Sequence, residues 1–341
     1  MESVPMKEND EHEALYRALT KLGYRSPVLS EGEAGWIRMD TKVGTYALWR
    51  IENTSSFMKT YQMLARFSSL ARHLMPYLPF ANGRLVLEAE GHAYVLSPHP
   101  QGENAASLIL SGDTSWIRPL MRVLAMIHRE SALSFPTSEL KKSLRLLSER
   151  WKEEERQIKT SVQKAQHALY PSPVEAILVA NADDLLHGMS TARAGIDLYL
   201  QEDALPVSYE LVFAHGALSL KNVYFTRQGI HIIDWRQATV DAPARDLGRI
   251  LREVIQFGSS LGIEVDLEGW LKTYELIRPL SVLDRQLFYV ALYYPHEPLV
   301  FLKKWWLNNI QGGELQATRA FESALDQYVR VRQAPLHHPS A

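Results

Sequence analysis

The sequence has no cysteine among its 341 residues, so disulfides, thiol nucleophiles and cysteine-based zinc sites are excluded. It also has no excess of either charge, since 37 basic and 39 acidic residues give a net charge of -2. No overall field therefore favours nucleic acid or an anionic membrane. No run approaches the ~18 consecutive apolar residues of a membrane span, and the polar start, Met1–Asp10, is no secretory signal. These absences fit an intracellular protein without insertion into a membrane.

The pattern along the chain predicts two lobes of different composition. Residues 1–97 alternate short apolar strands with helices, which indicates a small lobe with an antiparallel sheet plus a helix. Residues 98–103 belong to a breaker-rich linker, and 104–334 are mainly helical in period. Residues 335–341, rich in Pro and His, predict a disordered tail. We therefore expect an α+β fold with a small N-terminal and a large, mainly helical C-terminal lobe.

Several helices can be predicted from apolar residues at helical spacing. The clearest candidates are Phe57–Leu70, Trp116–Arg129, Pro173–Gly188, Thr191–Glu202 and Ala244–Phe257. Asp246 falls in the first turn of the last of these, where the helix dipole favours a carboxylate. The aromatic stretch Tyr293–Trp306 is either a partner surface or part of the core of the large lobe.

One stretch carries a pattern typical of a binding site. Two short apolar runs, Val223–Phe225 and Ile230–Ile233, flank a Gly-containing turn and predict a hairpin. A loop with His215 and Asn222 precedes the hairpin, and Asp234 follows it. Hard cations prefer such oxygen ligands, so the sequence predicts a cation site that phosphates would complete.

The spacing of these residues resembles a known catalytic core. His215-Gly216, Asn222 and Ile233-Asp234-Trp235 are similar to the His-Gly-Asp-x-x-x-x-Asn and Ile-Asp-Trp phrases of the aminoglycoside phosphotransferase/choline kinase branch of the protein-kinase-like fold. Further phrases of this family occur in the right order. They are the hinge-like Tyr94–Gly102, Leu124–His128 and Ala244–Gly248. The resemblance implies the bilobal protein-kinase-like fold over nearly the whole chain.

A narrower resemblance comes from the end of the chain. Tyr294–Phe301, followed by Trp305-Trp306, resembles a late phrase of the CotS-like bacterial spore coat proteins. The degenerate core looks most like the YutH type within that group. By this resemblance the protein is made in the cytoplasm, lies in the spore coat or at the spore surface, and has other spore coat proteins as partners.

Two catalytic positions of the family are altered here. Ala217 stands where the family has the aspartate that orients or deprotonates the substrate hydroxyl. Trp49 stands at the phosphate-binding lysine, and Phe57–Leu70 has no acidic residue to pair with such a lysine. Arg50 could replace the lysine only through a one-residue bulge, because neighbours on a strand point to opposite faces. We expect the Trp49 ring to occupy part of the nucleotide space.

Other family positions are retained. By resemblance, Asn222 and Asp234 would hold Mg²⁺; the alternative is that Asn222 caps its loop and Asp234 accepts backbone N–H groups. His215 and Asp246 would brace the catalytic loop. The Ser97 carbonyl and the His99 N–H would meet adenine at the hinge, so ATP and Mg²⁺ stay open as cofactors.

The sequence thus predicts a pseudokinase that serves as a binding and assembly component of the spore coat and has no nucleic-acid partner. One alternative is an active ATP-dependent small-molecule or protein phosphotransferase with displaced catalytic groups. Another is a nucleotide-sensing switch without turnover.

Overall fold

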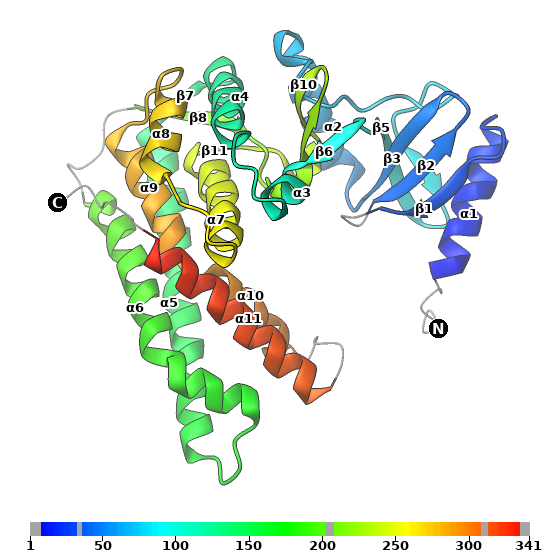
Figure 1. Cartoon of the computed structure of the whole chain (residues 1–341). Coiled ribbons are helices and arrows are strands. Elements are labelled where there is room, and N and C mark those ends of the chain that lie inside the picture. The colour runs from blue at the N-terminus through cyan, green and yellow to red at the C-terminus, as the bar shows by residue number, and fades with distance from the viewer. Residues whose placement is uncertain (1–7, 33–35, 202–207, 308–312, 335–341) are drawn as a thin grey trace. The chain divides into compact units, whose positions relative to one another are not determined.

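The computed structural model describes residues 8–32, 36–201, 208–307 and 313–334, so the predicted tail 335–341 lies outside the described residues. The chain forms two compact units (Figure 1). The first consists of Met1–Ser111 and His215–Thr239, and the second of Gly112–Ala214 and Val240–Ala341. The loop and hairpin after His215 therefore join the N-terminal unit, whereas the sequence assigned them to the helical lobe. No helix of the described ranges is long and apolar enough to span a membrane.

An antiparallel sheet of five strands, in the order β1-β2-β3-β5-β4, forms much of the first unit. The strands are β1 (Val28–Glu31), β2 (Ile37–Thr41), β3 (Gly44–Ile51), β4 (Leu87–Ala89) and β5 (His92–Pro98). β3 and β5 pair in a regular register, with Trp49 opposite Val95 and Arg50 opposite Tyr94. Because side chains alternate along a strand, Trp49 and Arg50 point to opposite faces; Trp49 is buried and Arg50 is exposed.

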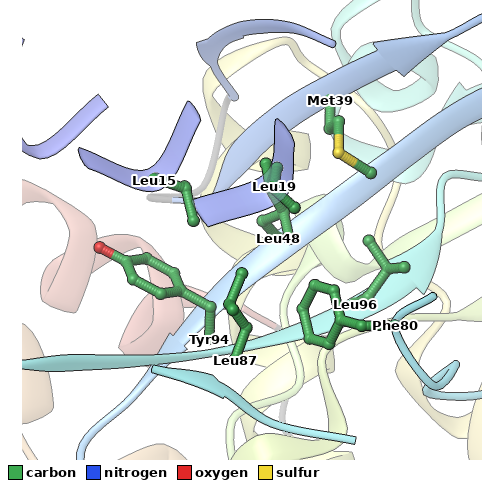
Figure 2. Packing of buried hydrophobic residues seen from close by; sticks show 8 residues of the cluster. All are labelled: Leu15, Leu19, Met39, Leu48, Phe80, Leu87, Tyr94 and Leu96. Atoms are coloured by element: carbon green, nitrogen blue, oxygen red, sulfur yellow. The ribbon is translucent and has the colours of Figure 1, made fainter. Parts of the chain in front are cut away.

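Helix α1 (Glu8–Lys21) supplies Leu15 and Leu19 to the core on one face of this sheet. Figure 2 shows both side chains together with residues of β2, β3, β4 and β5. The buried cluster is Leu15, Leu19, Met39, Leu48, Phe80, Leu87, Tyr94 and Leu96. Each such side chain removed from water contributes about 1.5–3 kcal/mol, which fixes α1 on the sheet.

Helix α2 (Thr54–Ala65) starts earlier and ends earlier than the apolar period predicts. The side chain of Asn53 accepts a hydrogen bond from the Ser56 N–H at 2.8 Å and so caps the helix start. A separate 3₁₀ turn, η1 (Ser68–Leu70), follows. The first turn of α2 is polar, and apolar periodicity therefore does not detect it.

The first unit also contains the predicted hairpin, as β9 (Val223–Thr226) and β10 (Gly229–Ile232). A third strand, β6 (Gly102–Asn104), pairs with β9 and leads into α3 (Ala105–Leu110). A Cβ at Gly102 would lie 2.1 Å from the Phe225 carbonyl oxygen, so only glycine permits this pairing. The breaker-rich linker thus ends in a strand that sequence patterns did not predict.

The second unit is mainly helical. Its helices are α4 (Ile117–Glu130), α5 (Thr137–His167), α6 (Pro173–Leu200), α7 (Ala244–Ser260), α8 (Leu267–Glu275), α9 (Val282–Tyr293), α10 (His296–Trp306) and α11 (Glu314–Gln333). A small sheet has the order β11-β8-β7, with β7 (Leu133–Pro136), β8 (Ser208–Ala214) and β11 (Thr239–Asp241). The long helices α5 and α6 lie side by side (Figure 1). The predicted α+β class, with a sheet-containing N-terminal part and a larger helical part, is confirmed.

The prediction of two helices over 173–202 is wrong, because α6 is continuous from Pro173 to Leu200. Its glycines are positions of close packing rather than ends. A Cβ at Gly188 would lie 1.8 Å from the Tyr328 hydroxyl, and one at Gly195 would lie 2.6 Å from Val290. A helix tolerates such glycines where a neighbour comes close, at a cost of about 1 kcal/mol each.

Candidate functional site

The structure places most of the predicted site residues in the first unit. They are Trp49, Ser97, His99, His215, Ala217, Asn222 and Asp234. Asp246 lies in the second unit, at the start of α7.

Asp234 directly follows β10 and has a left-handed backbone, with φ 64° and ψ 58°. Its carboxylate accepts two hydrogen bonds from one guanidinium: Arg236 Nε donates to Oδ1 at 2.5 Å and Nη2 donates to Oδ2 at 3.0 Å. The two side chains are 13% and 22% exposed. Burial acts to lower the pKa of Arg236, but the hydrogen bond and charge of Asp234 outweigh it and raise that pKa. The pair is therefore a charged, bidentate ion pair.

Arg236 makes two further contacts within the first unit. Its Nη1 donates a hydrogen bond to the Arg50 carbonyl oxygen. Its Cζ lies 4.8 Å from the centroid of the Trp49 ring, which is the geometry of a cation–π contact. The guanidinium is thus held between a carboxylate, a carbonyl and an aromatic face. Sequence reasoning missed Arg236, although it stands only two residues after Asp234.

Trp49 is fully buried, and its Nε1 donates a hydrogen bond to the Ser97 Oγ at 3.0 Å. Three more aromatic rings lie next to one another in space, starting from Trp49. Trp36 lies 6.0 Å from Trp49 and 4.8 Å from His99, and His99 lies 5.2 Å from Tyr224, between ring centroids. We call Trp36, Trp49, His99 and Tyr224 the aromatic cluster. Trp36 directly precedes β2, Trp49 lies in β3, His99 directly follows β5, and Tyr224 lies in β9.

The backbone of the predicted hinge continues the sheet. The His99 N–H, which was predicted to meet adenine, donates to the Thr45 carbonyl oxygen at 3.0 Å. Ser97 is the antiparallel partner of Ala47 and is buried. A nucleotide would have to replace the His99 hydrogen bond in order to use that donor. The roles of Ser97 and His99 toward adenine stay predictions.

The loop before the hairpin is fixed by His215, which is fully buried. The His215 Nε2 lies 2.8 Å from the Ile233 carbonyl oxygen, and the Ala217 N–H donates to His215 Nδ1 at 3.3 Å. These contacts assign the proton to Nε2 and the acceptor to Nδ1. Gly216 has a φ of +79°, and a Cβ there would lie 2.3 Å from the Gln237 carbonyl oxygen. The loop therefore holds its shape although Ala217 offers no catalytic oxygen.

Asn222 is buried and is bonded within its own loop. Its Oδ1 accepts a hydrogen bond from the Ser219 hydroxyl at 2.7 Å, and its N–H donates to the Ser219 carbonyl oxygen at 3.0 Å. Its carbonyl oxygen accepts the Ile233 N–H at 2.9 Å. These are the contacts expected of a residue that caps its loop and ties the loop to the end of β10.

The side-chain oxygens of Asn222 and Asp234 do not fit the magnesium ion that the resemblance implies. Both Asp234 carboxylate oxygens accept hydrogen bonds from Arg236, and the Asn222 Oδ1 accepts one from Ser219. Mg²⁺ requires oxygen ligands in near-ideal octahedral geometry, and a guanidinium on the same carboxylate opposes a second cation. Within the described ranges, no group of three or more His, Asp or Glu residues could hold a metal ion. No phosphoryl-transfer step through a metal follows from these residues.

The positions that could replace the missing lysine and glutamate do not do so. The regular register of β3 and β5 lacks the bulge that would turn Arg50 to the face of Trp49. Helix α2 contains no acidic residue.

Asp246 is fully buried in the second unit. Its Oδ2 lies 3.3 Å from His128 Nε2, and His128 Nδ1 lies 2.9 Å from the Tyr274 hydroxyl. Burial raises the pKa of Tyr274, so the phenol keeps its proton and its O–H donates a hydrogen bond to His128 Nδ1. The His128 Nε2–H then donates to Asp246, and the three side chains join α4, α8 and α7.

Comparisons with known proteins agree with this fold. The phosphotransferase enzyme family, APH, matches residues 28–280. An aminoglycoside phosphotransferase from Alicyclobacillus acidocaldarius superposes with a TM-score of 0.65 at 13% identity, over 97% of this chain and 97% of that chain. A spectinomycin phosphotransferase in complex with ADP and spectinomycin gives a TM-score of 0.64 at 14% identity, over 96% and 99%. A microcompartment-associated aminopropanol kinase gives 0.59 at 15% identity, over 94% and 97%.

No curated protein matches the sequence significantly. The structural likenesses have low identity and show the kinase-like fold alone.

Proposed function

This chain belongs to the phosphotransferase enzyme family, which matches residues 28–280, and we propose that it is a member that no longer transfers phosphate and works as a binding and assembly component. The observation that carries the proposal is the ion pair of Asp234 and Arg236. A guanidinium occupies both oxygens of the carboxylate that would hold Mg²⁺ in an active relative. Phosphoryl transfer depends on positioning and on metal-assisted neutralisation of charge, so a carboxylate engaged in this way does not serve it.

Two further replacements support the same proposal. Ala217 provides no oxygen to orient a substrate hydroxyl, and the buried Trp49 replaces the lysine that would contact phosphates. Removal of a single catalytic group often costs several powers of ten in rate, and each factor of ten corresponds to about 1.36 kcal/mol. The loss of three such contributions together favours recognition over catalysis.

Thermal unfolding with and without ATP and Mg²⁺ tests this proposal. Because a ligand present at 100 times its dissociation constant stabilises the native state by about 2.7 kcal/mol, binding would raise the melting temperature clearly. We expect no shift for the wild type at millimolar nucleotide. Arg236→Ala frees the Asp234 carboxylate, and the Asp234→Ala/Arg236→Ala double variant is its matched control.

An enzymatic assay decides between a binding protein and an active phosphotransferase. We expect no ATP turnover by the wild type above that of a heat-inactivated sample. Sustained turnover that is lost in Asp234→Ala would overturn the proposal. A melting shift without turnover would instead indicate a nucleotide-sensing switch.

We also propose that the partners are other spore coat proteins and that the site of action is the spore coat. The support is the resemblance of Tyr294–Phe301 and Trp305-Trp306 to the CotS-like phrase. A fluorescent fusion in sporulating cells of the source bacterium tests it, with a ring at the spore periphery as the expected result. Fluorescence that stays in the mother-cell cytoplasm after coat assembly would contradict it.

A further inference from the structure

A groove in the second unit lies between the C-terminal half of α5 and the end of α10. It encloses about 490 Å³, and we call it the α5–α10 groove. Its lining residues are Arg156, Gln157, Thr160, Ser161, Lys164, Lys303, Trp306 and Leu307. Three of them are cations, and no carboxylate stands among them. All of its lining residues belong to the second unit, whereas the hairpin belongs to the first.

The three cations differ in how far the protein already neutralises them. Lys303 Nζ lies 2.6 Å from the buried Glu154 carboxylate, and Arg156 lies 2.6 Å from Glu153. Lys164 is exposed and has no carboxylate partner within the described part of the chain. Lys164 is therefore the cation most available to a carboxylate from outside.

The apolar part of the groove comes from the end of α10. Leu307 is 70% exposed, and Trp306 is partly buried beside it. The Trp306 Nε1 is buried without a hydrogen-bond partner among the described residues. Large apolar side chains exposed next to charged groups are typical of surfaces that bind proteins.

The turn after α5 adds two exposed apolar side chains a few residues after Lys164. α5 ends at His167, three residues after Lys164, and the next segment holds Leu169 and Tyr170. These two side chains are 85% and 88% exposed. Exposed leucine and tyrosine on the turn between two long helices can reach a partner without any change in the helices.

We propose that the α5–α10 groove binds an acidic segment of a partner protein. An apolar side chain of the segment packs on Trp306 and Leu307, and a carboxylate of the segment faces Lys164. Charge complementarity selects the partner through Lys164, because Arg156 and Lys303 already have carboxylate partners, and the apolar contacts supply affinity. The proposal names the kind of partner for the binding role proposed above and rests on that role.

A labelled peptide made of Leu-Glu-Glu-Leu repeats is the probe, because its leucines form one apolar helix face that carboxylates flank. Its binding to the full chain is followed by fluorescence polarisation. One comparison peptide has lysine in place of every glutamate, and the other has serine in place of every leucine. We expect the acidic-apolar peptide to bind and both comparison peptides to bind at least ~10-fold more weakly, a difference of about 1.4 kcal/mol.

Two variants locate the binding in the groove. Lys164→Glu reverses the exposed cation, and Leu307→Ser removes the exposed apolar side chain; each is expected to weaken the acidic-apolar peptide at least ~10-fold. Lys152→Glu is the matched control, since Lys152 is an exposed lysine of α5 that does not line the groove. We expect Lys152→Glu to bind within ~2-fold of the wild type. Far-ultraviolet circular dichroism verifies that every variant is folded.

The outcomes separate this proposal from the proposed function. Equal binding of all three peptides, no binding of the acidic-apolar one, or equal losses in Lys164→Glu and Lys152→Glu would overturn the groove proposal. ATP turnover by the wild type would overturn the proposed function and leave the peptide result as it stands.

Discussion

Asp234 and Arg236 in the first unit neutralise one another, whereas Lys164 in the α5–α10 groove has no carboxylate partner among the described residues. The first region is closed by its own side chains: a carboxylate, a guanidinium and the buried Trp49 ring. The second region presents cations and exposed apolar side chains to solvent. The predicted site positions are thus satisfied by neighbouring side chains of the chain itself, while another surface of the molecule offers the unpaired cation Lys164.

The largest difference between the two regions is expected from their tryptophans. Trp49→Ala removes a fully buried ring and its hydrogen bond to Ser97, and we expect a loss of about 3–5 kcal/mol in the free energy of unfolding. Trp306→Ala removes a partly exposed ring from the groove, with an expected loss of about 1–2 kcal/mol. Urea unfolding followed by far-ultraviolet circular dichroism measures both. Equal losses of stability would contradict the expectation that the buried Trp49 ring contributes more than the partly exposed Trp306 ring.

Glycine substitutions compare how much stability is lost when a Cβ is added in the first unit and in the second. In Gly216→Ala the Cβ meets the Gln237 carbonyl oxygen on a backbone with positive φ, so we expect a loss of about 2–4 kcal/mol. In Gly188→Ala the Cβ meets the hydroxyl at the far end of the buried Tyr328 side chain and, at 3.0 Å, the Tyr293 carbonyl oxygen, but the helical backbone itself is unstrained. About 1–2 kcal/mol is expected there. Urea midpoints at constant slope measure the difference, and a larger loss for Gly188→Ala would reverse the expected order.

Removal of one charge should lower the free energy of unfolding at the Asp234–Arg236 pair and leave it nearly unchanged in the α5–α10 groove. Arg236→Ala leaves the Asp234 carboxylate, 13% exposed, without its donors, and we expect a loss of about 2–3 kcal/mol, below the 3–5 kcal/mol of fully buried pairs. Lys164→Ala should change stability by less than about 0.5 kcal/mol. Since Asp234 and Arg236 form one ion pair, the double variant Asp234→Ala/Arg236→Ala should lose less stability than the two single variants added together. Additive losses in urea unfolding would show that the pair does not act as a unit.

The smallest expected effect comes from acid. Burial, followed by the charge of His73, lowers the pKa of His231 in β10. The unfolded chain therefore takes up this proton at a higher pH than the folded chain. This contribution to stability is fully present above the unfolded pKa of about 6.5 and is lost as the pH falls below it. We expect the melting temperature to fall by a few degrees between pH 7.5 and pH 5.5, values that lie about one unit to either side of that pKa.

Two variants assign this acid effect. His231→Gln should make the fall in melting temperature smaller, whereas His187→Gln, on the exposed face of α6, should leave it unchanged. Part of the fall should persist in His231→Gln, because burial also lowers the pKa of His296 in the second unit. An identical pH dependence in all three proteins would exclude His231 as a contributor.

Local patterns in the sequence predicted much of the fold. The hairpin around residues 223–233 and the helix that holds Asp246 are encoded in short apolar periods and in turn residues, which can be read without tertiary contacts. Strand β6 was missed because its pairing depends on Phe225, more than a hundred positions along the chain. The continuous α6 was missed because Gly188 faces Tyr328, and only the folded neighbours reveal why glycine stands there.

The candidate site was predictable as a set of positions but not as a set of contacts. Family spacing singled out Asp234, Asn222 and Trp49. That spacing could not show that Arg236 turns back onto Asp234 and covers Trp49, because these contacts depend on side-chain directions after the hairpin. Trp36 and Tyr224 join the aromatic cluster for the same reason, through strand pairings that no local pattern encodes.

The left-handed backbone at Asp234 limits which residues can replace this aspartate during evolution. A φ of 64° with a ψ of 58° is accessible to Asp, Asn and Gly but strained for β-branched residues. A lineage can therefore exchange the carboxylate for an amide or a hydrogen without reshaping the turn after β10. The Arg236 guanidinium would keep the Arg50 carbonyl and the Trp49 ring as partners after such an exchange. We expect homologous chains that lose this aspartate to carry asparagine or glycine there, and not valine or isoleucine.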